Sequence, residues 1–236
     1  MPDPSATLVH DTAPAAARGD APRSARRRCA TCQRPLSSCL CGWICPTTQA
    51  VPVLVLQHPA EQAHAKGSVR LLRLSLQPCQ VEVGERFDPM ALARWLAAPA
   101  EGSATATPPA TATPLQSLLL YPVEPGDPAA AALSLPLSHP ARWRLVLLDG
   151  SWRQTRQMLR LNPLLQSLPR WALPAPPPSR YAIRRAQRPE QRSTLEAACL
   201  ALAALQGDAE RFAPLLAAFD GWVARELARR PPDGCF

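Results

Sequence analysis

Apolar runs without polar alternation recur along the chain and are separated by stretches with a helical pattern. Such runs are typical of strands covered on both faces, as in a parallel sheet, and they predict strands over residues 51–57, 117–122 and 144–150, with a weaker candidate at 80–84. Apolar residues at three- and four-residue spacing predict helices over residues 61–76 and 88–97. Strand and helix therefore alternate, which favours an α/β fold with a mostly parallel sheet flanked by helices.

Helix starts can be located from capping patterns. Two pairs of residues have the spacing of a capping box: Ser151 with Gln154, and Ser193 with Glu196. One helix should therefore begin directly after Gly150, and the other should end near Gly207, which can take the left-handed conformation that closes a helix. A further apolar pattern over residues 212–227 predicts a last packing helix.

Asp149 lies at the end of the apolar run 144–150, just before the first capped helix. Open α/β sheets bind ligands at the carboxyl ends of their strands, so this position makes Asp149 a candidate site residue. The alternative is that its carboxylate only satisfies N–H groups of the local loop. His58, which follows the first predicted strand, is expected to be a hydrogen-bonded structural residue. The chain contains no P-loop, no G-x-G-x-x-G and no nucleophilic triad.

The chain is basic, with 26 Lys and Arg residues against 18 Asp and Glu and a net charge of +8. Nearly all of this positive charge is arginine, whose guanidinium group suits bidentate contact with phosphate, so a nucleic acid is the first candidate partner. The alternative is that the charge only aids solubility and the arginines form a solvated surface. Basic residues gather in three places. Arg153, Arg156 and Arg160 are expected on a solvated face of the helix after Gly150, with Trp152, Thr155 and Leu159 on its packing face. Lys66, Arg70 and Arg73 are expected on one side of the helix over 61–76, and Arg180, Arg184 and Arg185 are interleaved with the aromatic ring of Tyr181.

A cysteine cluster near the N-terminus has the pattern C-x2-C-x6-C-x-C, formed by Cys29, Cys32, Cys39 and Cys41. Thiolates this close together in a reducing compartment favour a structural Zn²⁺ site, which needs soft ligands and no open position. Reduced free thiols or a redox pair are the alternatives, and Cys45 is a possible substitute ligand.

The N-terminal stretch of the sequence does not resemble an export signal. Residues 1–28 have the composition of a disordered tail with a basic end, and 29–45 form the cysteine module. We find neither an export signal nor an apolar run of membrane-spanning length, so a cytoplasmic protein with no membrane partner is expected. The sequence gives no sign of an obligate protein partner.

The stretch "LLDGSW", residues 147–152, resembles the D-x-[ST]-W signature of the DTW-domain proteins, the tRNA-uridine aminocarboxypropyltransferases. The likeness extends, in the family's order, through the cysteine cluster, "LQHPAEQAHAKGSVRLL", "LLYP", "DGSWRQTRQMLRLNP", "SRYAIRRA" and "STLEA", and covers most of residues 29–206. Ser151 stands where many members have Thr, which keeps the hydroxyl.

The resemblance implies a SPOUT-like catalytic domain over residues 46–236 with a C-terminal trefoil knot. Members of the family transfer the 3-amino-3-carboxypropyl group of S-adenosylmethionine to N3 of a tRNA uridine, here expected in the variable loop, and release methylthioadenosine. Asp149 would be the catalytic residue, as a base or as an acceptor that orients the nucleotide, and would also border the cofactor. The other expected cofactor residues come from three strand or helix ends: Leu120, Tyr121 and Pro122; Gly150, Ser151 and Trp152; Ser193 and Thr194.

Three other functions stay open at this point. A SPOUT methyltransferase would use the same pocket but leave S-adenosylhomocysteine. A related aminocarboxypropyltransferase would act on ribosomal RNA. A zinc-bearing RNA-binding protein would carry out no catalysis at all.

Overall fold

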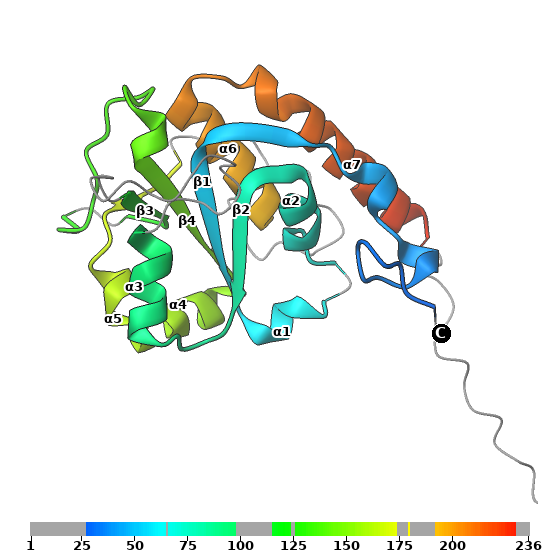
Figure 1. Ribbon diagram of the computed structural model, residues 1–236, viewed down its shortest axis with the longest axis horizontal. Coiled ribbons are helices and arrows are strands. Elements are labelled where there is room, and N and C mark those ends of the chain that lie inside the picture. The colour runs from blue at the N-terminus through cyan, green and yellow to red at the C-terminus, as the bar shows by residue number, and fades with distance from the viewer. Residues whose placement is uncertain are drawn as a thin grey trace, which may run out of the picture.

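A computed structural model describes residues 27–64, 66–97, 115–123, 126–173, 179 and 192–229 of the chain. Within these residues, five strands form one sheet in the order β2-β1-β4-β3-β5, and every pairing between neighbouring strands is parallel (Figure 1). The sheet therefore agrees with the expected α/β class. The strands are β1 (Thr47–Gln57), β2 (Leu76–Val83), β3 (Gln116–Leu120), β4 (Trp143–Asp149) and β5 (Arg170–Trp171).

Helices connect the strands and cover both faces of the sheet. The α-helices are α1 (Pro59–Gln62), α2 (Val69–Ser75), α3 (Pro89–Ala97), α4 (Trp152–Leu161), α5 (Pro163–Gln166), α6 (Thr194–Gln206) and α7 (Ala213–Ala228). Short 3-10 turns are η1 (Leu36–Ser38), η2 (Cys41–Trp43), η3 (Pro140–Arg142) and η4 (Glu210–Phe212).

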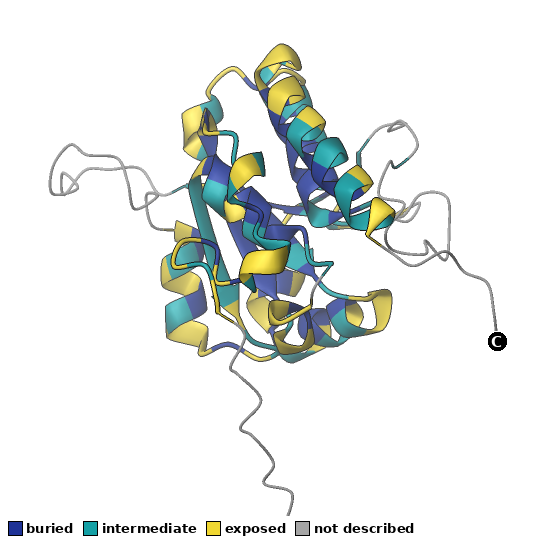
Figure 2. Cartoon of the chain, turned by 90° about the vertical axis from the view of Figure 1, so that its right-hand side faces the viewer, coloured by how far each residue is buried: buried dark blue, intermediate teal, exposed yellow. Residues whose placement is uncertain are grey.

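The two faces of the sheet belong to separate hydrophobic cores, which explains why the strand sequences lack alternation. In β1, Val53 and Val55 pack into one core with α2, α6 and α7, while Leu54 and Leu56 pack into the other with α3, α4 and α5. Figure 2 shows the buried residues concentrated in the sheet and on the inner faces of the helices. Because both faces are covered, successive residues of a central strand are all apolar.

The predicted strands and the helix over 88–97 are confirmed, with ends shifted by a few residues. The single helix expected over 61–76 is wrong. The chain instead forms α1 and α2 with a turn between them, where Gly67 donates to the carbonyl of His64, and Leu76 already belongs to β2. The apolar spacing continues across this turn, so periodicity alone did not mark the break. The two-residue strand β5 has no pattern of its own and was not expected.

The cysteine module shares its core with the rest of the molecule. Cys32 and Leu40 are buried in the same core as α6 and α7. Trp43 lies against Gly221 of α7, where a Cβ atom would come within 2.2 Å of the indole ring. The guanidinium of Arg225 on α7 lies 5.8 Å from the centre of the Trp43 ring. The module is therefore packed along α7, and Figure 1 shows the N-terminal segment beside the end of this helix.

Two parts of the expected organisation lie mostly outside the described residues. The tail over 1–28 is described only from residue 27, and much of the C-terminal part in which the knot is expected, residues 174–178, 180–191 and 230–236, is not described. The knot and the domain boundaries therefore stay predictions. None of the described helices has both the length and the apolar character that crossing a bilayer requires.

Candidate active site

Asp149 ends β4 at the point where the order of the strands changes direction. β1 and β4 are neighbours, and Gln57 at the end of β1 is paired with Asp149. From β1 the chain continues outward to β2, whereas from β4 it continues to β5 at the other edge. Ligands of open α/β sheets bind in the crevice at such a switch point. Asp149 therefore occupies the place that the sequence predicted for it.

The carboxylate of Asp149 is buried, with 7% of the residue exposed, and is held from two sides. The side-chain amide of Gln57 donates to Oδ2 at 2.9 Å, and the hydroxyl of Thr194 donates to Oδ1 at 2.5 Å. Both partners come from distant parts of the sequence, so the contacts differ from those of a carboxylate that only caps its own loop. The two hydrogen bonds fix the orientation of the carboxylate at the sheet edge.

The turn after Asp149 is shaped by a complete capping box. Gln154 Oε1 accepts from the N–H of Ser151 at 2.7 Å, and the hydroxyl of Ser151 accepts from the N–H of Gln154 at 3.4 Å. A Cβ atom at Gly150 would lie 3.1 Å from Cβ of Gln154, so the close approach of the turn to the helix favours glycine. The predicted start of α4 is thus confirmed.

The second capping box, at the start of α6, is confirmed too and is buried. Ser193 and Glu196 are each 6% exposed, and Glu196 accepts from both the N–H and the hydroxyl of Ser193. The hydroxyl of Ser68 accepts from the N–H of Leu195 at 3.4 Å, which ties the segment before α2 to the same turn. These contacts hold Thr194 beside Asp149. Gly207 ends α6 with a φ of 67°, as its position predicted.

The residues expected to border the cofactor are brought together in pairs. Thr194 contacts Asp149, and the ring of Tyr121 meets that of Trp152 edge to face, with 5.9 Å between the ring centres. Leu120 ends β3, which is paired with β4, so Tyr121 and Pro122 follow directly at the same edge of the sheet. Pro122 is exposed. The ends of β3, β4 and the start of α6 therefore form one surface around Asp149.

His58 has the structural role expected of it. Its Nδ1 accepts from the N–H of Ala60 at 3.2 Å and so caps α1, and its Nε2 lies 3.8 Å from a carboxylate oxygen of Glu85. Both ring nitrogens therefore face groups of the protein itself.

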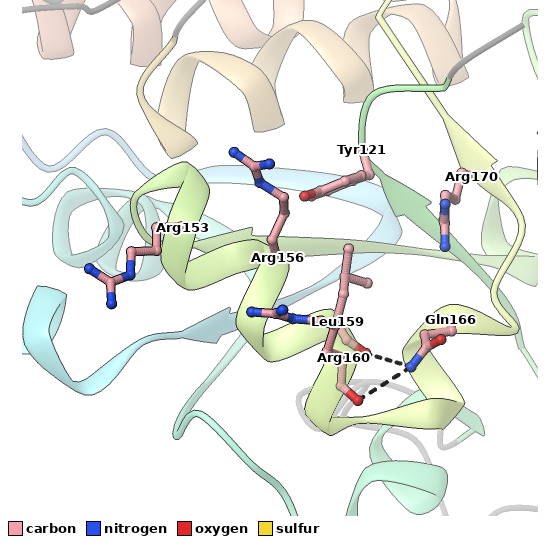
Figure 3. Close-up of a pocket in the computed structure, with 7 residues that line it drawn as sticks. All are labelled: Tyr121, Arg153, Arg156, Leu159, Arg160, Gln166 and Arg170. Atoms are coloured by element: carbon pink, nitrogen blue, oxygen red, sulfur yellow. Dashed lines mark hydrogen bonds between the residues drawn. The ribbon is translucent and has the colours of Figure 1, made fainter.

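The three arginines of α4 are exposed, as predicted, while Thr155 and Leu159 pack inward. Trp152, expected on the packing face, is 39% exposed. The arginine side chains line a pocket of about 670 Å³ (Figure 3), whose lining residues are Tyr121, Arg153, Arg156, Leu159, Arg160, Gln166 and Arg170. Sequence patterns did not indicate Gln166 or Arg170, because α5 and β5 are too short to show a periodicity.

The basic group around α2 differs from its prediction. Arg70 donates to the carbonyl of Cys32 at 2.6 Å, so this arginine is engaged with the cysteine module and is half-buried. Lys66 lies in the turn before α2, and Arg73 alone of the three is exposed on the helix. The expectation of one basic helix face is therefore wrong, because the cysteine module covers part of it. The remaining basic group, Arg180, Arg184 and Arg185 with Tyr181, lies outside the described residues.

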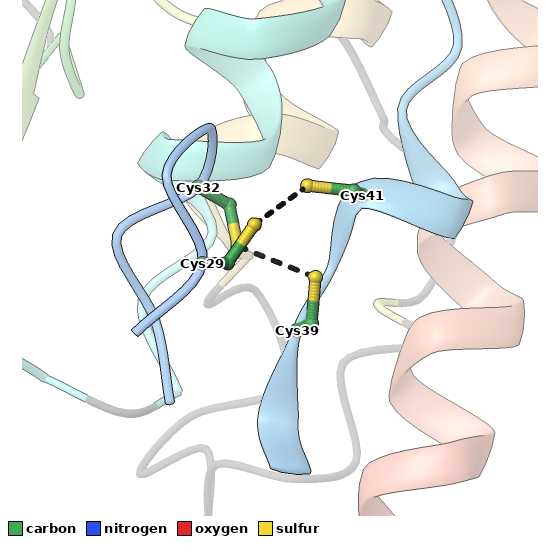
Figure 4. Close-up of side chains that lie close together, drawn as sticks. All are labelled: Cys29, Cys32, Cys39 and Cys41. Carbon is green, nitrogen blue, oxygen red and sulfur yellow. Dashed lines mark hydrogen bonds between the residues drawn. The ribbon is translucent and has the colours of Figure 1, made fainter. Parts of the chain in front are cut away.

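The four cysteines of the N-terminal cluster converge on one point (Figure 4). All four Sγ atoms lie within 4.8 Å of one another, with 3.5 Å between Cys29 and Cys41 and 3.7 Å between Cys32 and Cys39. Tetrahedral coordination with Zn–S bonds of about 2.3 Å places sulfur atoms about 3.8 Å apart, which matches these distances. The donor set and its spacing therefore fit a structural zinc ion.

The protein environment also distinguishes one thiol of the cluster, Cys29, from the cysteines of the core. The backbone N–H of Cys32, followed by the thiol of Cys41, lowers the pKa of Cys29 to about 6, whereas burial raises the pKa of Cys41 to about 12. Burial raises the pKa of both Cys79 and Cys199 to about 12, as expected for thiols that pack in a core. Cys45 does not belong to the metal-binding group among the described residues.

The fold and site together define an α/β protein with a parallel sheet, a carboxylate held at its switch point and a four-cysteine cluster. The chain belongs to the DTW domain family, whose model matches residues 26–227.

The chain is 32% identical over 198 residues to the tRNA-uridine aminocarboxypropyltransferase 2 of Drosophila melanogaster, covering 80% of this chain and 70% of the fly protein. It is 30% identical over 188 residues to the protein of the same name from Mus musculus and 29% identical over 194 residues to that of Macaca fascicularis. It spans 57% of the mouse protein and 58% of the macaque protein, and these alignments cover 77% and 78% of this chain. No solved structure matches it significantly.

Proposed function

We propose that this chain is a tRNA-uridine aminocarboxypropyltransferase that uses S-adenosylmethionine as donor and modifies N3 of a uridine in the variable loop. The names of its relatives support the reaction class. The observation that carries the proposal is the buried carboxylate of Asp149, held by Gln57 and Thr194 at the ligand-binding edge of the sheet. A SPOUT-like fold with a C-terminal trefoil knot belongs to the same proposal.

The reaction forms one C–N bond and breaks one C–S bond. Uridine N3 loses its proton and attacks the carbon of the aminocarboxypropyl group that is bonded to sulfur. The electron pair of that C–S bond stays on sulfur, so the sulfonium becomes the neutral thioether methylthioadenosine. A sulfonium offers three carbons to a nucleophile, and the protein selects the product by the carbon that it aims at N3.

Asp149 would act on the incoming uridine in one of two ways. It would either take the N3 proton or accept a hydrogen bond that orients the base, and both roles need an anionic oxygen at a fixed place. The hydrogen bonds from Gln57 and Thr194 supply this fixed place, and the aromatic pair of Tyr121 and Trp152 would border the donor or the base.

Asp149→Asn tests the proposal directly. The amide puts an N–H₂ group against the donors of Gln57 or Thr194 and removes the charge, so we expect transfer to fall by a factor of about 10³ while tRNA affinity changes little. The assay measures methylthioadenosine and the modified nucleoside by mass spectrometry. Asp208→Asn, which removes an exposed carboxylate at the other end of α6, is the matched control. Full activity of the Asp149 variant would refute the role.

The competing functions give different products. A methyltransferase would release S-adenosylhomocysteine in place of methylthioadenosine, and an enzyme specific for ribosomal RNA would leave tRNA unmodified. A binding protein without catalysis would give neither product, and S-adenosylmethionine would then not raise its melting temperature. One incubation with each RNA and the donor separates these cases.

We further propose that the arginines of the chain hold tRNA phosphates and that the cysteine cluster binds a structural Zn²⁺. The exposed side chains of Arg153, Arg156 and Arg160 support the first proposal, and Arg180, Arg184 and Arg185 are expected to join them. The zinc ion would fix a module that is joined to α2 through Arg70 and the carbonyl of Cys32, and that packs on α7 through Trp43.

Cys32→Ser tests the zinc proposal. We expect the purified variant to lose its zinc, measured by elemental analysis, and to melt at a lower temperature, because the ion stabilises only the folded loop. Cys45→Ser is the control, since Cys45 lies outside the cluster. Equal zinc contents in the wild type and the Cys32 variant would contradict the proposal.

A further inference from the structure

The pocket beside α4 has two walls of different origin. One wall consists of Arg153, Arg156 and Arg160 on α4, and the other is formed by Arg170 at the start of β5. In Figure 3, the arginines of α4 lie on one side, Arg170 on the other, and Tyr121 reaches in between them. The pocket is therefore not a flat basic face of one helix, because guanidinium groups border it from separate elements.

Arg170 is fixed in position by its surroundings. Its guanidinium is 3.0 Å from the carboxylate of Asp127, and both side chains are largely buried, with 23% and 14% exposed. Its backbone N–H donates to the carbonyl of Ala129, and its carbonyl accepts from Ala131. A guanidinium that is held by a carboxylate on one side can present its remaining N–H groups in a constant direction.

The pocket also has an apolar and an aromatic lining residue, and the aromatic one connects it to the candidate active site. Leu159 and the ring of Tyr121 line it, and the same ring meets Trp152 edge to face. Trp152 begins α4, three positions after Asp149. Tyr121, which the family resemblance leads us to expect beside the cofactor, is thus shared between the surface around Asp149 and the arginine pocket.

We propose that this pocket holds one nucleotide of the RNA substrate beside the target uridine, with its phosphate between Arg170 and the arginines of α4. This inference rests on the proposed function. Guanidinium groups on two sides match a phosphodiester, and an aromatic ring with a leucine suits the face of a base or a ribose. A volume of about 670 Å³ accommodates a nucleotide. Arg170 is the new binding residue, Tyr121 would contact this nucleotide in addition to its expected place beside the cofactor, and Asp127 is a positioning residue.

Arg170→Ala tests whether the wall of the pocket opposite α4 binds a phosphate. We expect tRNA affinity to fall about tenfold and the slope of log Kd against log salt to decrease by about 1, since one phosphate contact is lost. The measurement is fluorescence anisotropy of a labelled tRNA transcript over a range of KCl concentrations. Arg211→Ala is the matched control, because Arg211 is also paired with an aspartate, at 2.8 Å, but lies before α7 near the amino end of β1. It should change neither quantity.

Asp127→Asn tests whether Asp127 positions Arg170, because the direction of the change in tRNA affinity separates this role from a simple effect of charge. Removing a negative charge beside RNA would by itself strengthen binding, whereas releasing Arg170 should weaken it, and we expect about fivefold weaker binding. The asparagine Oδ1 can still accept from the N–H of Ala129, so the turn is preserved and the melting temperature should stay within a few degrees. Asp208→Asn, which breaks the control pair, should leave tRNA affinity unchanged.

The possible outcomes separate the two proposals. If Arg170→Ala keeps the affinity and salt slope of the wild type, or if Asp127→Asn binds more tightly, the nucleotide pocket is refuted even when transfer proceeds. If the wild type binds tRNA through Arg170 but produces no methylthioadenosine, the proposed reaction is refuted and the pocket is retained. Lower affinity of both Arg170 and Asp127 variants, with their controls unchanged, supports the pocket.

Discussion

The helices α4 and α6 begin with the same capping motif, and both starts lie beside the carboxylate of Asp149. The two turns differ in how far they are buried. In α4 the box is formed by Ser151 and Gln154, and its serine is exposed. In α6 it is formed by Ser193 and Glu196, and both residues are buried. The α6 box therefore belongs to the core, whereas the α4 box lies at a surface that a ligand can reach.

The third residue of each helix, neutral Gln154 in α4 and acidic Glu196 in α6, differs in charge in line with this difference in burial. Gln154 makes the reciprocal hydrogen bond from a partly exposed position, where a neutral amide is sufficient. Glu196 additionally accepts from the hydroxyls of Ser193 and Ser179, so its carboxylate binds several donors in a buried place. Such a network is costly to break, because each remaining donor would lose its partner away from water. We infer that α6 is the fixed support of the site and α4 its accessible side.

Glu196→Ala should have the largest effect on stability. It leaves the buried N–H and hydroxyl of Ser193 without their acceptor, and we expect the free energy of unfolding to fall by about 3 kcal/mol. Gln154→Ala, at the matching position of α4, should cost about 0.5–1 kcal/mol. Urea denaturation of both variants measures the difference. Equal losses would show that burial does not distinguish the two boxes.

Thr194→Val should act on the reaction more than on stability. It removes the hydroxyl that donates to Asp149 at 2.5 Å, and we expect kcat/KM for transfer to fall about tenfold, the value of one hydrogen bond to a charged group. Thr194→Ser keeps the donor and should restore most of the activity. Thr155→Val, which removes a buried hydroxyl from α4, is the control and should leave kcat/KM within twofold. An unchanged rate in Thr194→Val would mean that this contact is not needed to hold Asp149 for the proposed reaction.

The sequence allowed the fold class and the position of Asp149 to be predicted, because both depend on local patterns. Apolar runs mark strands that are covered on both faces, and capping boxes mark helix starts to the residue. The same reasoning located the cysteine cluster, whose ligands lie close together along the chain. Family resemblance supplied the expected reaction and the residues expected around the cofactor, neither of which follows from the pattern of apolar and polar positions.

These local patterns could not predict contacts between segments that are distant in the sequence. Gln57 and Asp149 are 92 positions apart, and Arg170 and Asp127 are 43 apart, so neither pair leaves a signal in local spacing. For the same reason, the helical periodicity of α2 indicated an arginine face but not that the carbonyl of Cys32 would bind Arg70. Local patterns therefore did not predict which elements pack over one another. This packing is what buries the capping box of α6 and leaves that of α4 exposed.

The smallest expected difference is in the stability lost when the capping serine of each box, Ser151 or Ser193, is replaced by alanine. Each accepts from the N–H of the third helical residue, at 3.4 Å for Ser151 and 3.2 Å for Ser193, so alanine should weaken both helix starts. We expect Ser151→Ala to cost about 0.5–1 kcal/mol and Ser193→Ala about 1–2 kcal/mol, since only the latter leaves buried partners unsatisfied. Thermal and urea unfolding of both variants, with the pair combined in a double mutant, measures the costs. Because the serines cap separate helices, the two losses should add, and a clear departure from additivity would show that the turns are coupled through Asp149.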